Sequence, residues 1–373
     1  MKYKSITTEL RRMLVSGQFP AGSQLPCRQE LLVRFGASVA SFQKCINILK
    51  EEGFLESRGG SGMYVSDNPP NLYACALLLP IGSSERISLD SVWSAFIKAG
   101  SGLTRNGRQV IIKPYYVGFW ESAQPSEMER FLTDARNHTL CGAISFGRLK
   151  ITGVRDDFPL ISFDYRIPDP QQNSIHSTTD HSKLFSRCLE TLEKLGCRRV
   201  AGVFQYTMNN PSQLQILDTI SRHRDIYFPS EWLLPMDLRH TDSLFFAQQL
   251  EGLFSDNLKR HPDGLIVTNH NFLPLVMRVL AKRGIVCGRD LQIVSHCNIP
   301  TDVEFIDNVH YIAFDFNKIL SQCLDLFWQF PQKREELLRE VVYFEPSPLP
   351  DTCRQPPQCA SHHAAMHSSA CGK

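Results

Sequence analysis

The sequence predicts an α/β protein in which a small helical unit with a two-stranded hairpin precedes a two-lobed α/β region. Two patterns indicate this fold class: amphipathic helices with a glycine-rich hairpin over residues 1–66, then apolar strands alternating with amphipathic helices over residues 72–345. The length of 373 residues supports it, because one hydrophobic core seldom holds so long a chain.

The first 66 residues predict three helices, over 4–15, 27–35 and 38–52, followed by a hairpin. Ser38 suits the N-cap of the third helix and Gly53 ends it. Its inward face carries apolar residues at positions i, i+3, i+4 and i+7, which are Phe42, Cys45, Ile46 and Leu49. Three helices and a two-stranded wing form a winged helix-turn-helix, whose recognition helix enters the major groove of DNA.

The charge pattern agrees with a DNA-binding unit at the N-terminus. The whole chain has a net charge of only +2, so no global basic field indicates nucleic acid. Residues 1–70 carry nine Lys and Arg against six Asp and Glu, a net charge of +3. The outward face of the third helix offers side chains that donate to phosphates or base edges, which are Ser41, Gln43, Lys44, Asn47 and Lys50.

The run SGQFPAGSQLPCRQELLVRFGASVASFQKCINILKEEGFLESRGGSGMYV resembles the DNA-binding domain of the GntR family of bacterial transcription regulators. The resemblance rests on the order and spacing of G-x-x-x-x-G-x-x-L-P, E-L, F-G-x-S, L-x-x-x-G-F and G-x-G-x-x-V. It implies a DNA-contact set of Arg28, Gln29, Ser38, Ser41, Gln43, Lys44, Arg58 and Gly60. Three positions where the family often carries arginine hold Gln29, Val39 and Gln43 here.

Beyond a proline-containing linker at residues 67–71, apolar strands and amphipathic helices alternate as in βαβ units with parallel sheets. Helices are predicted over 88–106, 124–137, 180–195, 211–223, 241–257, 272–283 and 316–330. Residues 72–345 contain more alternating strands and helices than one sheet usually holds, so we expect two lobes. Residues 346–373 are rich in Pro, Ser, Ala, His and Cys, and we expect a tail without fixed structure.

The second region is similar to the periplasmic-binding-protein-like effector domain of LacI-type repressors. The similarity lies in FPLISFDYR, HSTTDHSKLFSRCLETLEKLGCRRVAGVF, GLIVTNHNFLPLVMRVLAKRGIVCGRDLQIVSH and NVHYIAFDFNKI. It implies an effector-binding set in the cleft of Asp164, Asn269, Cys297, Asn298 and Phe314. Half of the family's sugar-binding polar groups are replaced, so the ligand is less polar than a free sugar, other side chains bind it, or the cleft is empty. Other side chains that could contribute are Arg148, Tyr165, Arg166, His270 and His296.

These patterns exclude several classes of protein. The start MKYKSITTELRRML lacks a secretory core, and no apolar run is long enough to span a bilayer, so we expect a cytoplasmic chain with reduced thiols. A P-loop, a G-x-S-x-G elbow and an HExxH motif are absent, and we expect no enzymatic activity, cofactor or metal. A cluster of Cys and His in the tail is better explained by an unstructured segment than by a metal site.

We therefore expect a ligand-responsive transcription regulator that acts as a repressor. Its winged helix at 1–66 would bind a pseudo-palindromic DNA operator as a homodimer. Its effector domain at 72–345 would bind a small molecule, with sugars and sugar derivatives as candidates. Three alternatives stay open: a solute-binding protein, an enzyme on a two-lobed scaffold, and a regulator whose sensor has lost its ligand.

Overall fold

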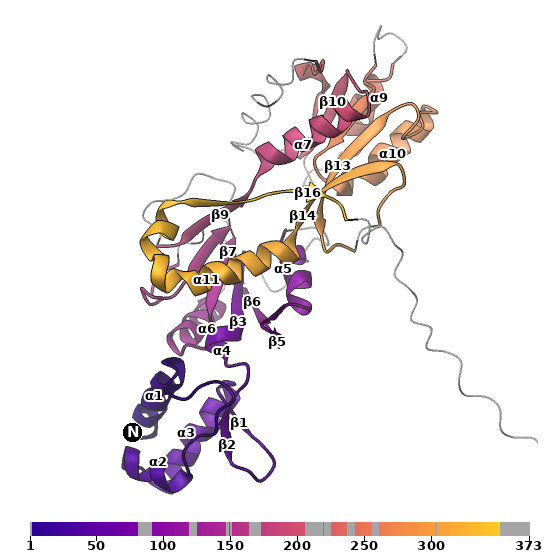
Figure 1. Cartoon of the computed structure of the whole chain (residues 1–373). Helices are drawn as coiled ribbons and strands as arrows, with labels where there is room; N and C mark the ends of the chain where they lie inside the picture. Colours follow the sequence, from indigo (N-terminus) through magenta and orange to yellow (C-terminus); the bar gives the residue numbers. More distant parts are fainter. Residues whose placement is uncertain are drawn as a thin grey trace, which may run out of the picture.

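The computed structural model describes residues 2–80, 92–118, 125–146, 149, 151–163, 173–205, 219, 225–236, 243–255, 261–302 and 304–350. The N-terminal helical head, a first α/β lobe and a second α/β lobe follow one another along the long dimension of the molecule (Figure 1). No helix within these ranges is both long and apolar enough to cross a membrane.

The head contains α1 (Lys2–Val15), α2 (Arg28–Phe35) and α3 (Val39–Glu51), followed by β1 (Leu55–Ser57) and β2 (Met63–Val65). The strands pair antiparallel with Leu55 opposite Val65. The core of the head combines the predicted inward faces of α1 and α3 with Leu25, Leu31 and Phe54. The head is a winged helix, as the sequence predicts.

Lobe 1 contains a parallel six-stranded sheet in the order β15-β9-β8-β7-β3-β6. Its strands are β3 (Ala74–Leu79), β6 (Ile111–Tyr116), β7 (Gly142–Phe146), β8 (Leu160–Phe163), β9 (Ile175–Thr179) and β15 (Val341–Phe344). Helices α5 (Val92–Ser101) and α11 (Phe316–Arg339) cover one face, and α6 (Pro125–Arg136) covers the other. Every residue of β3 is buried, which explains its unbroken apolar run.

Lobe 2 contains the sheet β11-β10-β12-β13-β14-β16, in which only the short β16 is antiparallel. The strands are β10 (Val200–Gln205), β11 (Leu233–Met236), β12 (Gly264–Val267), β13 (Gln292–Ile299), β14 (Val309–Asp315) and β16 (Ser347–Pro348). Helix α7 (His181–Lys194) covers one face, while α9 (Ser243–Gly252) and α10 (Leu273–Lys282) cover the other.

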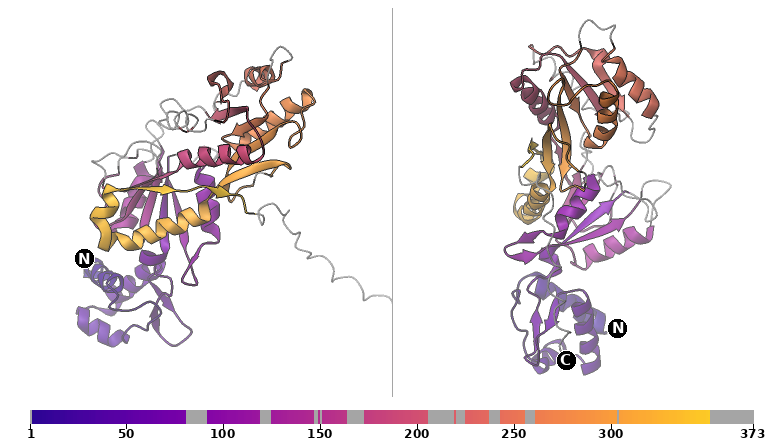
Figure 2. Two further views of the ribbon diagram at one scale, coloured as in Figure 1. Left: turned by 45° about the horizontal axis from the view of Figure 1, so that its top comes forward. Right: turned by 90° about the vertical axis from the view of Figure 1, so that its right-hand side faces the viewer.

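The chain crosses between the lobes three times: from β9 to α7, from β14 to α11, and from β15 to β16. Figure 2 shows α11 lying along lobe 1, with the yellow segment that follows it passing on to lobe 2. The carboxyl ends of the parallel strands of each lobe consequently face the other lobe. One buried apolar cluster runs from lobe 1 through the boundary into lobe 2.

Several elements differ from the sequence predictions. The helix predicted over 88–106 ends at Ser101, and a small hairpin of β4 (Thr104–Arg105) and β5 (Arg108–Gln109) follows. Helix α11 continues past Pro331, with non-helical backbone angles at Lys333, because both segments pack into the core of lobe 1. Strands β9, β11, β15 and β16 were not predicted. The helix predicted over 211–223 and the tail beyond residue 350 lie almost entirely outside the described residues.

Candidate nucleic-acid interface and effector site

The start of the recognition helix is fixed by the cap that the sequence predicts. The Ser38 hydroxyl accepts a hydrogen bond from the Ser41 backbone nitrogen at 3.3 Å and donates one to the Ser41 hydroxyl at 3.0 Å. Both predicted DNA-contact serines therefore take part in the cap that begins the helix.

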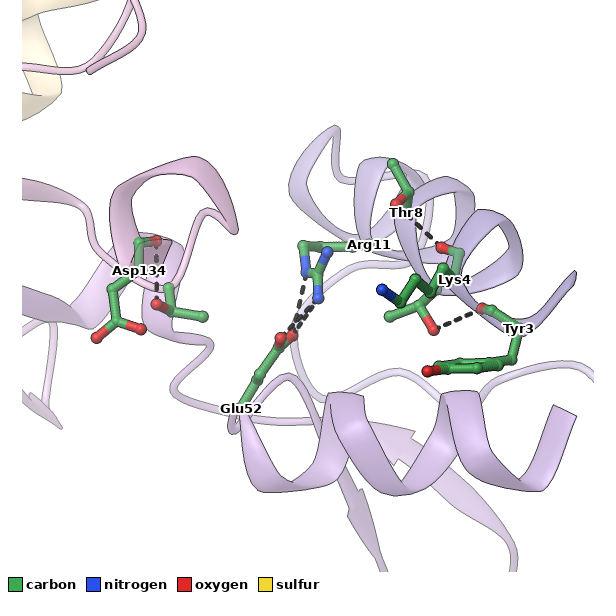
Figure 3. Close-up of polar contacts among 8 residues, drawn as sticks. Tyr3, Lys4, Thr8, Arg11, Glu52 and Asp134 are labelled. Carbon is green, nitrogen blue, oxygen red and sulfur yellow. Dashed lines mark hydrogen bonds and ion pairs between the residues drawn. The ribbon is translucent and has the colours of Figure 1, made fainter. Parts of the chain in front are cut away.

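Helix α3 is held against α1 by a buried ion pair. The Arg11 guanidinium donates to both carboxylate oxygens of Glu52, at 2.6 and 2.7 Å from one nitrogen and 3.0 Å from another (Figure 3). The two side chains are only 10% and 17% exposed. This contact joins residues 41 positions apart in the sequence and fixes the C-terminal end of α3 to α1 beside their shared apolar core.

The outward face of α3 is polar and exposed. Gln43 donates from Nε2 to Oδ1 of Asn47 at 2.9 Å. Lys44 places its ammonium 4.3 Å from the ring centroid of Tyr3 on α1, and Lys50 donates to the Ser57 hydroxyl at 2.9 Å. These groups and the exposed Arg28 and Gln29 at the start of α2 form the candidate DNA-binding face.

The wing contains a contact that sequence reasoning missed. Arg58 donates to Glu56 at 2.7 Å and to Asp67 at 2.8 Å, and its guanidinium lies 4.7 Å from the Tyr64 ring centroid. The hydrogen bond to Glu56 raises the pKa of Arg58. Gly60 adopts φ 72° at the tip of the hairpin, a conformation that favours glycine. Arg58 is therefore paired with two carboxylates of its own chain.

Asp67 also connects the wing to lobe 1. Its backbone carbonyl accepts a hydrogen bond from Arg108 of the β4–β5 hairpin. On the same hairpin, Arg105 pairs with Asp325 of α11 at 2.5 Å and stacks on Trp328 at 4.8 Å. A cavity of about 330 Å³ lies nearby, lined by groups of α1, the linker, lobe 1 and α11. Through Asp67 and the β4–β5 hairpin, these contacts connect the wing to α11, the helix that begins at the lobe boundary.

The predicted effector residues that the structure describes have different surroundings. Asn269 caps the short helix η3 (His270–Phe272), where its side chain accepts from the Asn271 backbone nitrogen at 3.0 Å. Cys297 is fully buried in the core of lobe 2, and Phe314 is 1% exposed in the core shared by the lobes. Asp164 lies outside the described residues, as do the other candidates Arg148, Tyr165 and Arg166.

Three histidines lie where the lobes meet: the buried His270 after β12, the half-buried His296 in β13 and the half-buried His181 at the start of α7. His296 is 2.9 Å from the Thr268 carbonyl through Nδ1 and 3.1 Å from the Asn298 amide through Nε2. His181 lies 2.9 Å from the Thr179 hydroxyl, and the Phe314 ring lies 5.9 Å from His181 and 5.4 Å from His296. Burial lowers the pKa of the imidazoles of His181, His270 and His296 to about 4, so they are neutral at pH 7.

Aromatic rings occupy the corresponding edge of lobe 1. Strands β7, β8 and β15 each end in phenylalanine, a pattern visible in the sequence as GAISF, LISF and VVYF. Phe96 of α5 contacts the rings that end β7 and β8 and also Phe316 of α11, with centroid distances of 5.2 Å to Phe146, 5.4 Å to Phe163 and 4.9 Å to Phe316. The ring that ends β15, Phe344, stacks on Phe163 at 6.0 Å. Lys98 of α5 pairs across the boundary with Asp302 at 2.6 Å. The described ranges hold no group of three metal-binding side chains.

Comparisons with known proteins agree with both halves of this description. Residues 2–65 match the model of the gntR family of bacterial regulatory proteins. No curated protein sequence matches the chain.

Two crystal structures, a LacI-family regulatory protein from Chloroflexus aggregans and a transcriptional regulator LacI from Bacillus cereus subsp. cytotoxis, resemble the chain. Each has a TM-score of 0.52 and 14% identity, over 74% of this chain and 96% of the other. The complex of the transcriptional regulator CelR with cellobiose has a TM-score of 0.50 and 13% identity, over 84% of this chain and 90% of the other. The predicted fold class is confirmed: the chain joins an N-terminal domain of the GntR family to a two-lobed region with the fold of LacI-family regulators.

Proposed function

We propose that the protein is a transcription regulator that binds double-stranded DNA through the outward face of α3 and responds to a small molecule held between its lobes. The observation that carries this proposal is the exposed polar face of a GntR-family recognition helix, set by the Ser38 cap and the Arg11–Glu52 pair. A recognition helix places its N-terminal residues against base edges.

The homodimer on a pseudo-palindromic operator belongs to this proposal. Arg28, Lys44 and Lys50 supply exposed cations, three in each head and six in a dimer. Neutralising about six phosphates gives log K a slope of about −5 against log salt concentration. We therefore expect fluorescence anisotropy of the full-length protein on upstream DNA to show saturable binding that weakens steeply with salt. A slope near zero would contradict phosphate contacts by these cations.

The effector would bind where the two sets of strand ends meet. The solved CelR structure contains cellobiose, so sugars are the first class of compound to test. The phenylalanines at the lobe 1 edge are buried, so a ligand would reach them only after the lobes move apart. These rings and the neutral imidazoles at the lobe 2 edge would then favour a ligand with an apolar face and few charges. A ligand bound between two lobes changes DNA affinity only if it binds two lobe arrangements with different affinities.

A second candidate is a regulator without a small-molecule effector. The burial of Cys297 and Phe314 favours it, because these two predicted effector positions are packed in apolar cores. The two candidates are separated by a thermal-shift screen of sugars and aromatic metabolites, followed by DNA-binding assays with every hit. A compound that raises the Tm and changes DNA affinity supports the sensor, whereas a complete absence of hits favours the second candidate.

A further inference from the structure

The recognition helix presents a stripe of uncharged side chains along one side of its exposed face. Val39, Gln43 and Asn47 lie at positions i, i+4 and i+8, so they are neighbours on the helix surface. All three are exposed, and Val39, the first residue of the helix, is 56% exposed although it is apolar. Val39 therefore presents an apolar surface at the tip of the recognition helix.

The chemistry of this stripe is unusual for guanine recognition. The most common specific contact with guanine uses arginine or lysine paired with O6 and N7. Helix α3 contains no arginine, and Lys44 lies beside the stripe with its ammonium against the Tyr3 ring. A glutamine amide matches N6 and N7 of adenine, and an apolar side chain matches the C5 methyl group of thymine.

We propose that this stripe reads A·T base pairs in each half-site, with Gln43 pairing to adenine and Val39 packing on a thymine methyl group. This inference rests on the proposed function and names the class of operator. The hydrogen bond from Gln43 to Asn47 uses one amide N–H and leaves the second N–H and the carbonyl oxygen of Gln43 for the adenine edge. Asn47 therefore orients Gln43.

The spacing of the stripe sets the spacing of the two bases. Four residues of α-helix span about 6 Å. Successive base pairs rise about 3.4 Å. Val39 and Gln43 thus read base pairs that lie about two steps apart, and one half-site carries both.

Selection of binding sites from random duplex DNA by the full-length protein tests the inference. We expect an enriched inverted repeat whose half-sites share a thymine and an adenine about two steps apart. A repeat whose shared contacted positions are G·C pairs would overturn the inference and leave the proposed function intact. Failure to enrich any sequence would instead reject the proposed function, and the inference with it.

Modified bases in the selected site then identify each contact without altering the protein. Replacing the conserved thymine by deoxyuridine removes one methyl group and should weaken binding about fourfold per half-site, since a buried methylene is worth about 0.8 kcal/mol. Replacing the adenine by 7-deazaadenine removes the N7 acceptor and should weaken binding about tenfold. Unchanged affinity for both modified sites would overturn the inference.

Protein variants assign the contacts to residues. In Val39→Ala the deoxyuridine effect should disappear, and in Gln43→Ala the 7-deazaadenine effect should disappear. Val39→Arg should shift the selected base toward guanine. Val286→Ala, at an exposed valine of lobe 2, is the matched control and should keep both effects. A deoxyuridine effect that persists at full size in Val39→Ala would exclude Val39 as the reader.

Discussion

The Arg11–Glu52 pair offers the sharpest test of how the head positions its recognition helix. Replacing Arg11 by alanine leaves the Glu52 carboxylate without its bidentate partner at a site where both side chains are at least 83% buried. Removing one member of a buried ion pair costs about 3 kcal/mol or more. The α1 and α3 amides that exchange by opening of this contact should then exchange about 150-fold faster, because 1.4 kcal/mol corresponds to a factor of ten.

Hydrogen exchange with mass spectrometry on the full-length protein measures the exchange rates of the α1 and α3 amides directly. The measurement does not depend on how the two lobes unfold. Arg12→Ala is the matched control on the same helix, because the Arg12–Glu9 pair is exposed and exposed pairs contribute little. Peptides from lobes 1 and 2 should be unaffected in both variants. Equal protection of α1 and α3 in Arg11→Ala and Arg12→Ala would refute the assignment of the buried pair as the contact that holds α3.

Three further predictions concern the wing, the lobe packing and the histidines. The double variant Glu56→Gln/Asp67→Asn removes both carboxylate charges that hold Arg58, so it should free Arg58 for a phosphate and steepen the salt dependence of DNA binding by about two units in a dimer. A decrease of that size in Arg58→Ala would instead show that Arg58 already binds DNA in the native chain. Gly142→Ala places a methyl group 2.7 Å from the Phe327 ring, so it should destabilise lobe 1 by about 1–3 kcal/mol in urea unfolding; an unchanged midpoint would contradict the packing of α11. Burial lowers the pKa of three histidines from 6.5 to about 4. Their contribution to stability should therefore be fully present above pH 6.5 and be lost toward pH 4, where the unfolded chain binds protons and the folded chain does not. His296→Asn should flatten this decline in thermal unfolding, and an identical pH profile would refute the assignment.

Local sequence patterns predicted the head well. The inward face of α3, the Ser38 cap and the glycine-rich hairpin depend on residues close together in the chain, and all of them are found in the structure. The Arg58–Asp67 contact was not predictable in the same way. Neither residue belongs to a periodic pattern, and the pair depends on how the linker folds back onto the wing.

The lobes show where sequence reasoning stopped. Helix α11 was predicted to end before Pro331, but Phe330 and Leu337 are both buried in lobe 1, so packing sustains the helix across the proline. The effector positions were implied by the resemblance to LacI-type repressors, and their role stays a prediction. Periodicity alone could not show that the side chains of Cys297 and Phe314 point into apolar cores, because a parallel strand is covered on both faces.

DNA binding by full-length protein with an altered α3 face tests the central claim most directly. The measurement is fluorescence anisotropy on the selected operator, comparing the native chain with a Gln43→Ala/Lys44→Ala variant and with the Val286→Ala control. We predict that the native chain and the control bind with equal affinity in the presence of random competitor DNA, while the α3 variant loses specific binding and keeps its folded state by circular dichroism. Specific binding of undiminished affinity by a folded α3 variant would contradict the assignment of this helix as the DNA-reading element.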